Sequence, residues 1–202
     1  MKSKGLIIAL AIVGGIILLG IMTISWGVST YNTLVGMDES VNGAWSQVQN
    51  QYQRRFDLIP NLVETVKGYA THEKETLENV TNARAKVGQM VISPEVLKNP
   101  QAFQMFEKAQ GELTSALTRL MAVSENYPNL KANENFLQLQ AQLEGTENRI
   151  SVERKRFNEV VQAYNTKIKT VPTSLVAGFG GFTAKQYFQA AAGAESAPKV
   201  KF

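Results

Sequence analysis

The first apolar run of the chain, residues 6–26, reads LIIALAIVGGIILLGIMTISW and carries no charge. About twenty helical residues at 1.5 Å rise each span the roughly 30 Å hydrocarbon core of a bilayer. A cleaved secretory signal is the alternative, but its apolar core is only about 7–15 residues long and precedes a small-residue cleavage site. Ser25-Trp26-Gly27 is a poor match to such a site. The pattern therefore favours one uncleaved transmembrane helix.

Beyond this run, apolar residues recur with the spacing of helices, in steps of three, four and seven. Four segments of comparable length present such a stripe, and a partly polar seam on the last one suits a bundle better than a two-stranded coiled coil. The sequence predicts an all-α protein, in which an N-terminal transmembrane helix precedes an antiparallel four-helix bundle of long helices. The stripes comprise Leu34, Val41, Trp45, Val48 and Tyr52; Leu62, Val66, Tyr69, Leu77, Val80 and Val87; Phe103, Phe106, Leu113, Leu117, Leu120 and Tyr127; and Phe136, Leu143, Ile150, Phe157 and Tyr164.

Pro60 separates the first two stripes, and two interpretations are open. Proline removes a backbone donor and disfavours the helical conformation of Ile59. A reversal of the chain at residues 57–60 gives four helices of similar length. A mere kink leaves one helix of roughly 90 Å that outruns its partners and needs another subunit to cover it. We expect the reversal, because an unburied apolar stripe costs about 25 cal/mol per Å².

The end of the chain differs in composition from the rest. Glycines alternate with large apolar residues from Pro172 onward, and Ala- and Ser-rich sequence follows. Glycine breaks the helix while the aromatic residues still favour burial. We expect the tail to fold back over the bundle end; insertion into the membrane interface and docking on a neighbouring subunit are the alternatives. The candidate contact residues of the tail are Phe179, Phe182, Tyr187 and Phe188.

Three regions follow: a transmembrane anchor (1–28), a helical bundle (29–171) and a Gly-, aromatic- and Ala-rich tail (172–202). The formal net charge is +4, of which Lys2 and Lys4 supply half. These lysines precede the apolar run, so the positive-inside rule places the N-terminus in the cytoplasm and the bundle on the extracytoplasmic side of the inner membrane. The nearly neutral remainder indicates no nucleic-acid partner.

Several motifs along the chain resemble those of the LemA family. They are QRRFDLIPNLVETVKGYA at residues 53–70, ARA at residues 83–85, ENYPNLKA at residues 125–132 and RKRFN at residues 154–158. The resemblance implies a bacterial membrane protein with one N-terminal anchor and an α-helical domain. It implies no reaction, because the family offers no agreed catalytic residues.

The sequence carries only a fragment of one catalytic or metal-binding motif. His72-Glu73 begins like a zinc-protease helix, but Thr76 stands where the second histidine belongs, and the chain has one histidine and no cysteine. The sequence contains neither a phosphate loop nor a Gly-x-Ser-x-Gly elbow. We therefore expect no catalytic residues, no cofactor and no metal.

Two polar or small-residue features remain as candidate contacts. Arg54, Arg55 and Asp57 flank Pro60; they are interpreted as capping groups where one helix ends and the next begins, with a partner-docking face as the alternative. Ala11 and Gly15 have the small-xxx-small spacing that permits close contact between transmembrane helices.

These features together favour a membrane-anchored helical scaffold that self-associates and organises partners at one membrane face. Its expected partners are membrane lipid, further copies of itself and an unidentified membrane or envelope protein. An accessory subunit that regulates an envelope protease or transporter is the second hypothesis, and an unrecognised hydrolase is the third.

Overall fold

The computed structural model describes residues 2–90 and 93–189, and within these residues the regular structure is entirely helical. The side chains of residues 2–6 are not described. Short 3₁₀ turns connect the helices at Pro94–Lys98 (η1) and Ser124–Asn126 (η2). The α-helices are α1 (Lys2–Lys67), α2 (Lys74–Gly88), α3 (Pro100–Val123), α4 (Pro128–Lys131), α5 (Glu134–Lys169) and α6 (Thr173–Phe179).

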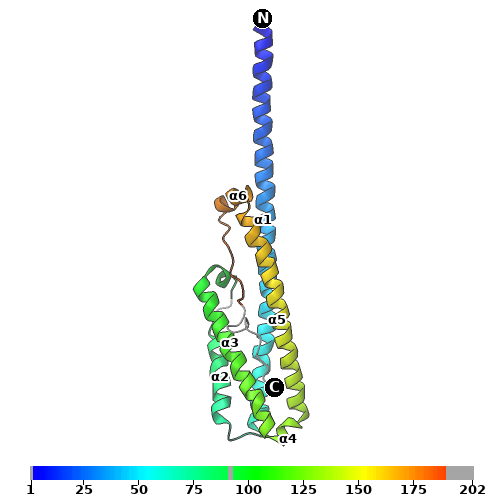
Figure 1. Cartoon of the computed structure of the whole chain (residues 1–202), viewed down its shortest axis with the longest axis vertical. Helices are drawn as coiled ribbons and strands as arrows, with labels where there is room; N and C mark the ends of the chain where they lie inside the picture. The colour runs from blue at the N-terminus through cyan, green and yellow to red at the C-terminus, as the bar shows by residue number, and fades with distance from the viewer. Residues whose placement is uncertain (1, 91–92, 190–202) are drawn as a thin grey trace, which may run out of the picture.

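Helix α1 is one continuous helix that has two different surroundings. Its first part projects bare beyond all other helices (Figure 1), and residues 7–25 expose their side chains throughout. We call residues 7–28 the apolar segment. From Leu34 onward the apolar stripe of the same helix is buried. At 1.5 Å per residue, its 66 residues extend over about 100 Å.

The predicted reversal at residues 57–60 is wrong, because α1 continues through Pro60 to Lys67. Proline has no N–H to donate to the carbonyl of Phe56, four residues earlier. Arg84 of α2 supplies a substitute: its Nε donates to the Phe56 carbonyl oxygen at 3.3 Å, and its guanidinium lies 3.8 Å from the centre of the Phe56 ring. The chain turns only at residues 68–73, so the first helix is longer and the second shorter than predicted.

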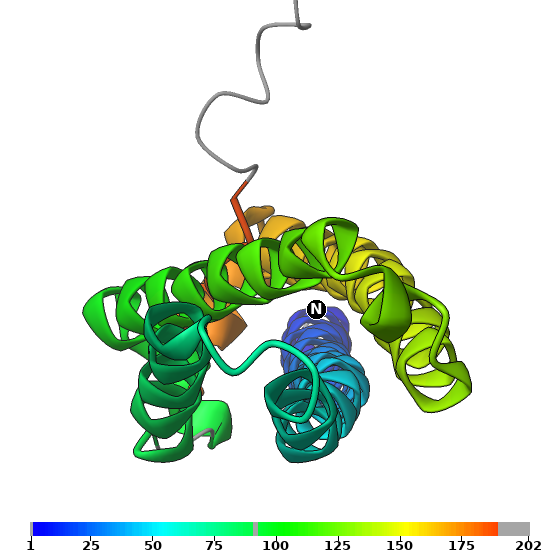
Figure 2. The same cartoon turned by 90° about the horizontal axis from the view of Figure 1, so that it is seen from below.

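The helices pack as two antiparallel pairs. Helix α5 runs back along α1, while α2 pairs with α3 (Figure 1). Seen along the long axis, α2, α3 and α5 form an arc around α1 (Figure 2). We call the end of this assembly next to the apolar segment the proximal end and the opposite end, at α4, the distal end.

The interior divides into two clusters with different side chains. The proximal core is rich in aromatic rings, whereas the distal core is almost entirely aliphatic. The proximal core contains Leu34, Val41, Trp45, Val48, Tyr52, Leu97, Phe103, Phe106, Ile150, Phe157, Val161, Tyr164, Ile168, Ala177 and Phe188. The distal core contains Ile59, Leu62, Val66, Ala70, Val80, Ala83, Val87, Ala109, Leu113, Leu117, Leu120, Val123, Leu130, Phe136 and Leu143.

The tail as far as Gln189 lies against the helices. Helix α6 sits beside α1 at the proximal end, and the chain then runs distally along α5 (Figure 1). The Asn165 side chain bonds both backbone groups of Lys185 at 2.9 Å, and Asn158 does the same for Phe188 at 2.9 Å. The remainder of the predicted tail, residues 190–202, lies outside the described residues.

Candidate functional site

The three polar residues predicted to act together near Pro60 lie in different environments. Arg54 and Asp57 are exposed, and Asp57 accepts a hydrogen bond from Gln53 Nε2 at 2.8 Å. Arg55 is only 1% exposed. Because α1 does not end here, no open helix terminus is available for these groups to cap. The capping interpretation is therefore wrong.

Arg55 instead forms a buried polar cluster with residues of α3 and α5. Its Nη1 donates to Thr114 Oγ1 and to Glu147 Oε1, both at 2.8 Å, and its Nη2 donates to Gln110 Oε1. We call Arg55, Gln110, Thr114 and Glu147 the arginine cluster. The Glu147 side chain is 33% exposed, so the cluster reaches from the interior to the surface. The cluster joins three helices through one guanidinium.

The arginine cluster lies at the boundary between the two cores. On α1, Tyr52 belongs to the proximal core and Ile59 to the distal core, and Arg55 falls between them. The guanidinium carbon of Arg55 is 5.1 Å from the centre of the Tyr52 ring. Burial raises the pKa of the Tyr52 hydroxyl. On the outer side, an open groove of about 370 Å³ is lined by Thr114, Leu117, Thr118, Met121, Leu143, Glu144, Glu147 and Asn148.

A second polar cluster fastens the tail near the proximal end. Lys185 Nζ forms an ion pair with Asp38 Oδ1 of α1 at 2.6 Å, and the lysine side chain is only 2% exposed. The Tyr164 hydroxyl of α5 donates to the Thr183 carbonyl at 3.1 Å. Burial, together with the nearby Asp38 carboxylate, raises the pKa of Tyr164. We call Asp38, Tyr164, Asn165 and Lys185 the tail clasp.

The apolar tail candidates also separate. Phe188 is buried against Trp45, with ring centroids 5.9 Å apart. Phe182 is half-buried and meets the Tyr31 ring edge-on at 5.4 Å. Tyr187 is exposed and Phe179 is 94% exposed. In the apolar segment, the predicted contacts Ala11 and Gly15 are both exposed.

Sequence reasoning missed the partners of Arg55, although a signal was present. The buried stripe of α1 advances in steps of four and three from Val41 to Val66, and Arg55 occupies one of its positions. Gln110 occupies a corresponding position between Phe106 and Leu113 on α3. Polar residues at apolar register positions of two helices indicate a buried polar contact. The tail clasp has no such signal, because Lys185 lies in an irregular segment that has no helical register.

The described residues contain no group of three or more His, Cys, Asp or Glu side chains that could hold a metal ion. His72 is exposed in the turn between α1 and α2. The arginine cluster presents a fixed cation whose terminal nitrogens are already engaged. Its hydrogen bonds link α1 to α3 and α5.

Comparison with known proteins places this architecture in a family. A sequence profile of the LemA family matches residues 44–202. The magnetosome protein MamQ 2 of Paramagnetospirillum magneticum is 28% identical over 175 residues, 79% of this chain and 64% of that protein. MamQ of Magnetospirillum gryphiswaldense is 26% identical over 174 residues, which cover 78% and 64%.

Protein LemA of Metamycoplasma hominis is 27% identical over 149 residues, 72% of this chain and 63% of that protein. The chain thus spans a little under two thirds of the length of each of these relatives. The matched region includes the buried part of α1 from Ala44 and all the later helices. The resemblance seen in the sequence is confirmed: the chain belongs to the LemA family.

Proposed function

We propose that this protein is a single-pass, membrane-anchored helical scaffold that self-associates and presents partners at one membrane face. The observation that carries the proposal is the continuity of α1, which is bare and mostly apolar over residues 7–26 and buried in the helical domain from Leu34. A helix that is apolar on all sides and unburied is typical of a membrane span. Since one helix supplies both parts, the domain stands on the bilayer without a flexible linker.

The anchor is tested by extraction of the full chain from membranes with alkaline carbonate. Ile16→Lys/Leu19→Lys places two charges near the middle of the span, each costing about 2.5–3.5 kcal/mol on insertion scales. The wild-type chain is expected in the membrane pellet and this variant in the soluble fraction. Val152→Lys, at an exposed position on α5, is the matched control and stays in the pellet. Release of the wild-type chain contradicts the proposal.

The side of the membrane is tested by labelling, because the chain has no cysteine. Lys131→Cys places a single thiol at the exposed distal end of the domain. An extracytoplasmic domain predicts reaction with a membrane-impermeant maleimide in intact spheroplasts. Ser3→Cys, on the other side of the span, is the control that reacts only after lysis. The reversed pattern assigns the domain to the cytoplasmic face.

The scaffold role is tested by measuring the mass of the particle extracted with its lipid. Light scattering is expected to show a homomer larger than a monomer, with no foreign chain at a fixed ratio. A stoichiometric second protein in the particle overturns the scaffold in favour of an accessory subunit. Purified monomer that remains monomeric in nanodiscs contradicts self-association.

A further inference from the structure

Helix α6 carries an apolar face that the helical domain does not cover. Its inward side, at Thr173 and Ala177, is buried. Its outward side carries Leu175 and Phe179, which are 62% and 94% exposed, and Val171, in the turn just before the helix, is 83% exposed. Positions four apart lie on one side of a helix. Leu175 and Phe179 therefore form a short apolar strip directed away from the protein, and the exposed Val171 precedes it.

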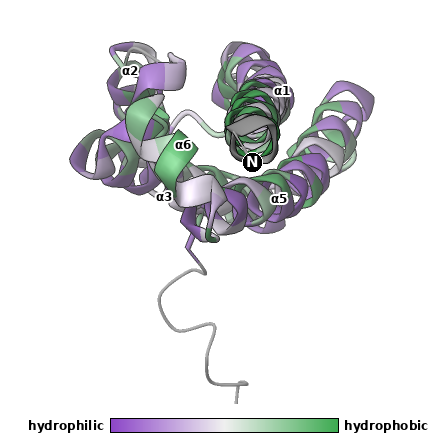
Figure 3. Cartoon of the chain, turned by 90° about the horizontal axis from the view of Figure 1, so that it is seen from above, coloured by the Kyte–Doolittle hydropathy of each residue, from purple (hydrophilic) through white to green (hydrophobic). Residues whose placement is uncertain are grey.

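This strip lies at the level where α1 leaves its predicted span. Directly after α6, Phe182 packs against Tyr31 of α1, with ring centroids 5.4 Å apart. Tyr31 follows Trp26 by five residues, or about 7.5 Å of helix. The headgroup layer of a bilayer is about 5–7 Å thick on each side. Figure 3 looks down from the apolar segment and shows the hydrophobic colour of α6 beside α1.

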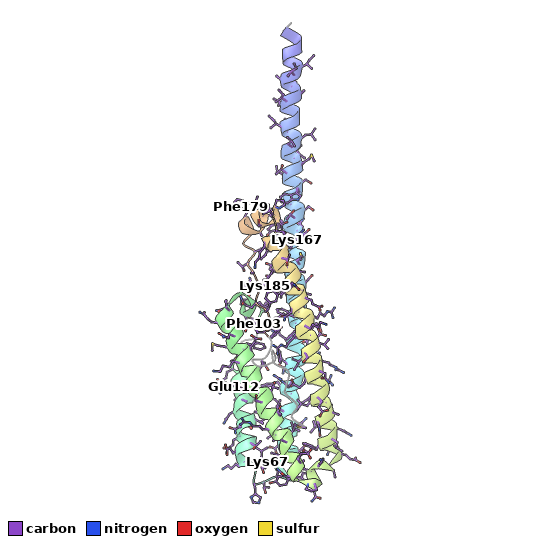
Figure 4. All side chains as sticks on the ribbon, viewed as in Figure 1. Lys67, Phe103, Glu112, Lys167, Phe179 and Lys185 are labelled. Atoms are coloured by element: carbon purple, nitrogen blue, oxygen red, sulfur yellow. The ribbon has the colours of Figure 1, made fainter. Side chains whose placement is uncertain are left out.

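The charge around the strip suits an anionic lipid surface. Residues 160–189 contain no Asp or Glu, and of their three lysines Lys185 is buried and paired with Asp38, which leaves Lys167 and Lys169 free of that ion pair. Lys167 and Lys169 are exposed in the last turn of α5, directly before the strip. Figure 4 shows Lys167 and Phe179 together at the proximal end. Basic residues near a membrane surface are attracted to anionic headgroups.

We propose that α6 is a second, interfacial membrane contact. Val171, Leu175 and Phe179 enter the boundary between headgroups and acyl chains, and Lys167 and Lys169 bind anionic headgroups. This inference rests on the proposed anchoring of α1 in the same bilayer. The tail clasp and the Phe182–Tyr31 contact hold α6 at a fixed height, so two separate points of the domain meet the membrane and fix its tilt.

The test uses single cysteines labelled with an environment-sensitive nitrobenzoxadiazole dye in the full-length chain. Leu175→Cys reports on the strip, and Ile17→Cys reports on the span. Val152→Cys is the matched control: its side chain is 63% exposed, like Leu175 at 62%, but it lies on α5 at least about 25 Å from the strip. Each protein is reconstituted in vesicles of phosphatidylglycerol and phosphatidylcholine containing a shallow doxyl-labelled lipid.

An interfacial face buried about 5–10 Å into the boundary predicts doxyl quenching at position 175 at least about threefold stronger than at 152, with blue-shifted emission. Equal quenching at 175 and 152, with position 17 quenched, overturns the inference and leaves the anchor intact. Blue-shifted but unquenched emission at 175 shows that a second protein copy covers the strip, and it also overturns the inference. Absence of quenching at 17 rejects the anchor and the inference together.

Discussion

The proximal and distal cores both fill the space between helices, but with different kinds of side chain. The distal core is formed by residues of α1, α2, α3, α4 and α5, and its buried residues are aliphatic except for Phe136. In the proximal core α1 and α5 continue beyond α2 and α3, and the turn η1 and the tail complete the packing. There the rings of α3, α5 and the tail surround Trp45 of α1, and each aromatic side chain buries about 150–250 Å². The difference shows that the tail is part of the proximal core.

The two cores meet at a polar layer, the arginine cluster. An aliphatic seam can slide by one heptad at little cost, whereas a buried charge has only one position in which its partner is present. We infer that the arginine cluster fixes the register of the two cores. Aromatic packing and the buried cation are thus two separate contributions to how the helices align. The following variants separate these contributions.

The largest effect is expected from Trp45→Ala in the proximal core. Trp45 is fully buried and meets the rings of Phe106 and Phe157 with centroids 5.5 Å apart. Its loss is expected to cost about 3–5 kcal/mol through lost transfer energy and the cavity left behind. Chemical denaturation followed by circular dichroism measures the loss. Met105→Ala, at an exposed position of α3, is the control, and its free energy of unfolding should change little.

The next effect is an asymmetry within the arginine cluster. Glu147→Ala leaves the Arg55 cation buried without its anionic partner, and about 3 kcal/mol of stability is expected to be lost. Arg55→Met/Gln110→Leu removes the cation together with its buried amide partner and leaves Glu147, which is one third exposed, to be solvated. This variant should lose less than about 1.5 kcal/mol. Equal losses for the two variants would show that the layer acts only through packing.

Arg84→Ala is expected to cost about 1.5 kcal/mol, because it removes a charge-assisted hydrogen bond to the Phe56 carbonyl. Pro60→Ala restores the backbone donor for that carbonyl. In a double-mutant cycle, Arg84→Ala should therefore cost less in the Pro60→Ala background. Additive losses would mean that Arg84 acts on Phe56 only through its ring.

The smallest effect concerns alkaline pH and the tail clasp. The folded state raises the pKa of Tyr164 above its ordinary value of 10.0, so it favours the protonated phenol. The resulting stability is fully present below pH 10 and is lost as the pH rises through the folded-state pKa. Tyr164→Phe is expected to lose about 1 kcal/mol at neutral pH, for its hydrogen bond to Thr183, and to have a shallower decline above pH 10. Denaturation series at several pH values measure how steeply the stability of each protein falls above pH 10. Equal slopes for the wild type and Tyr164→Phe would exclude Tyr164 as the source of the alkaline loss.

Local pattern was enough to predict much of this fold. The apolar segment and buried residues such as Trp45, Leu113 and Phe157 follow directly from periodicity. Pro60 was misjudged because the group that compensates for it, Arg84, lies on another helix. Arg55 was interpreted wrongly for a similar reason, since it was grouped with its sequence neighbours Arg54 and Asp57 and not with the buried stripe it belongs to. Predictions fail where a tertiary contact replaces what the local chain lacks.

The unbroken path of α1 from the apolar segment into both cores has a mechanical consequence. Because α1 has no break between the apolar segment and the cores, rotation of one part about the helix axis rotates the other part with it. One residue inserted after Ser29 would turn the helical domain by about 100° relative to the apolar segment. A seven-residue insertion would restore its facing to within about 20° while raising it by about 10 Å. In the proposed membrane-anchored protein, the rotation of the apolar segment in the bilayer would therefore set the direction that each surface of the helical domain faces.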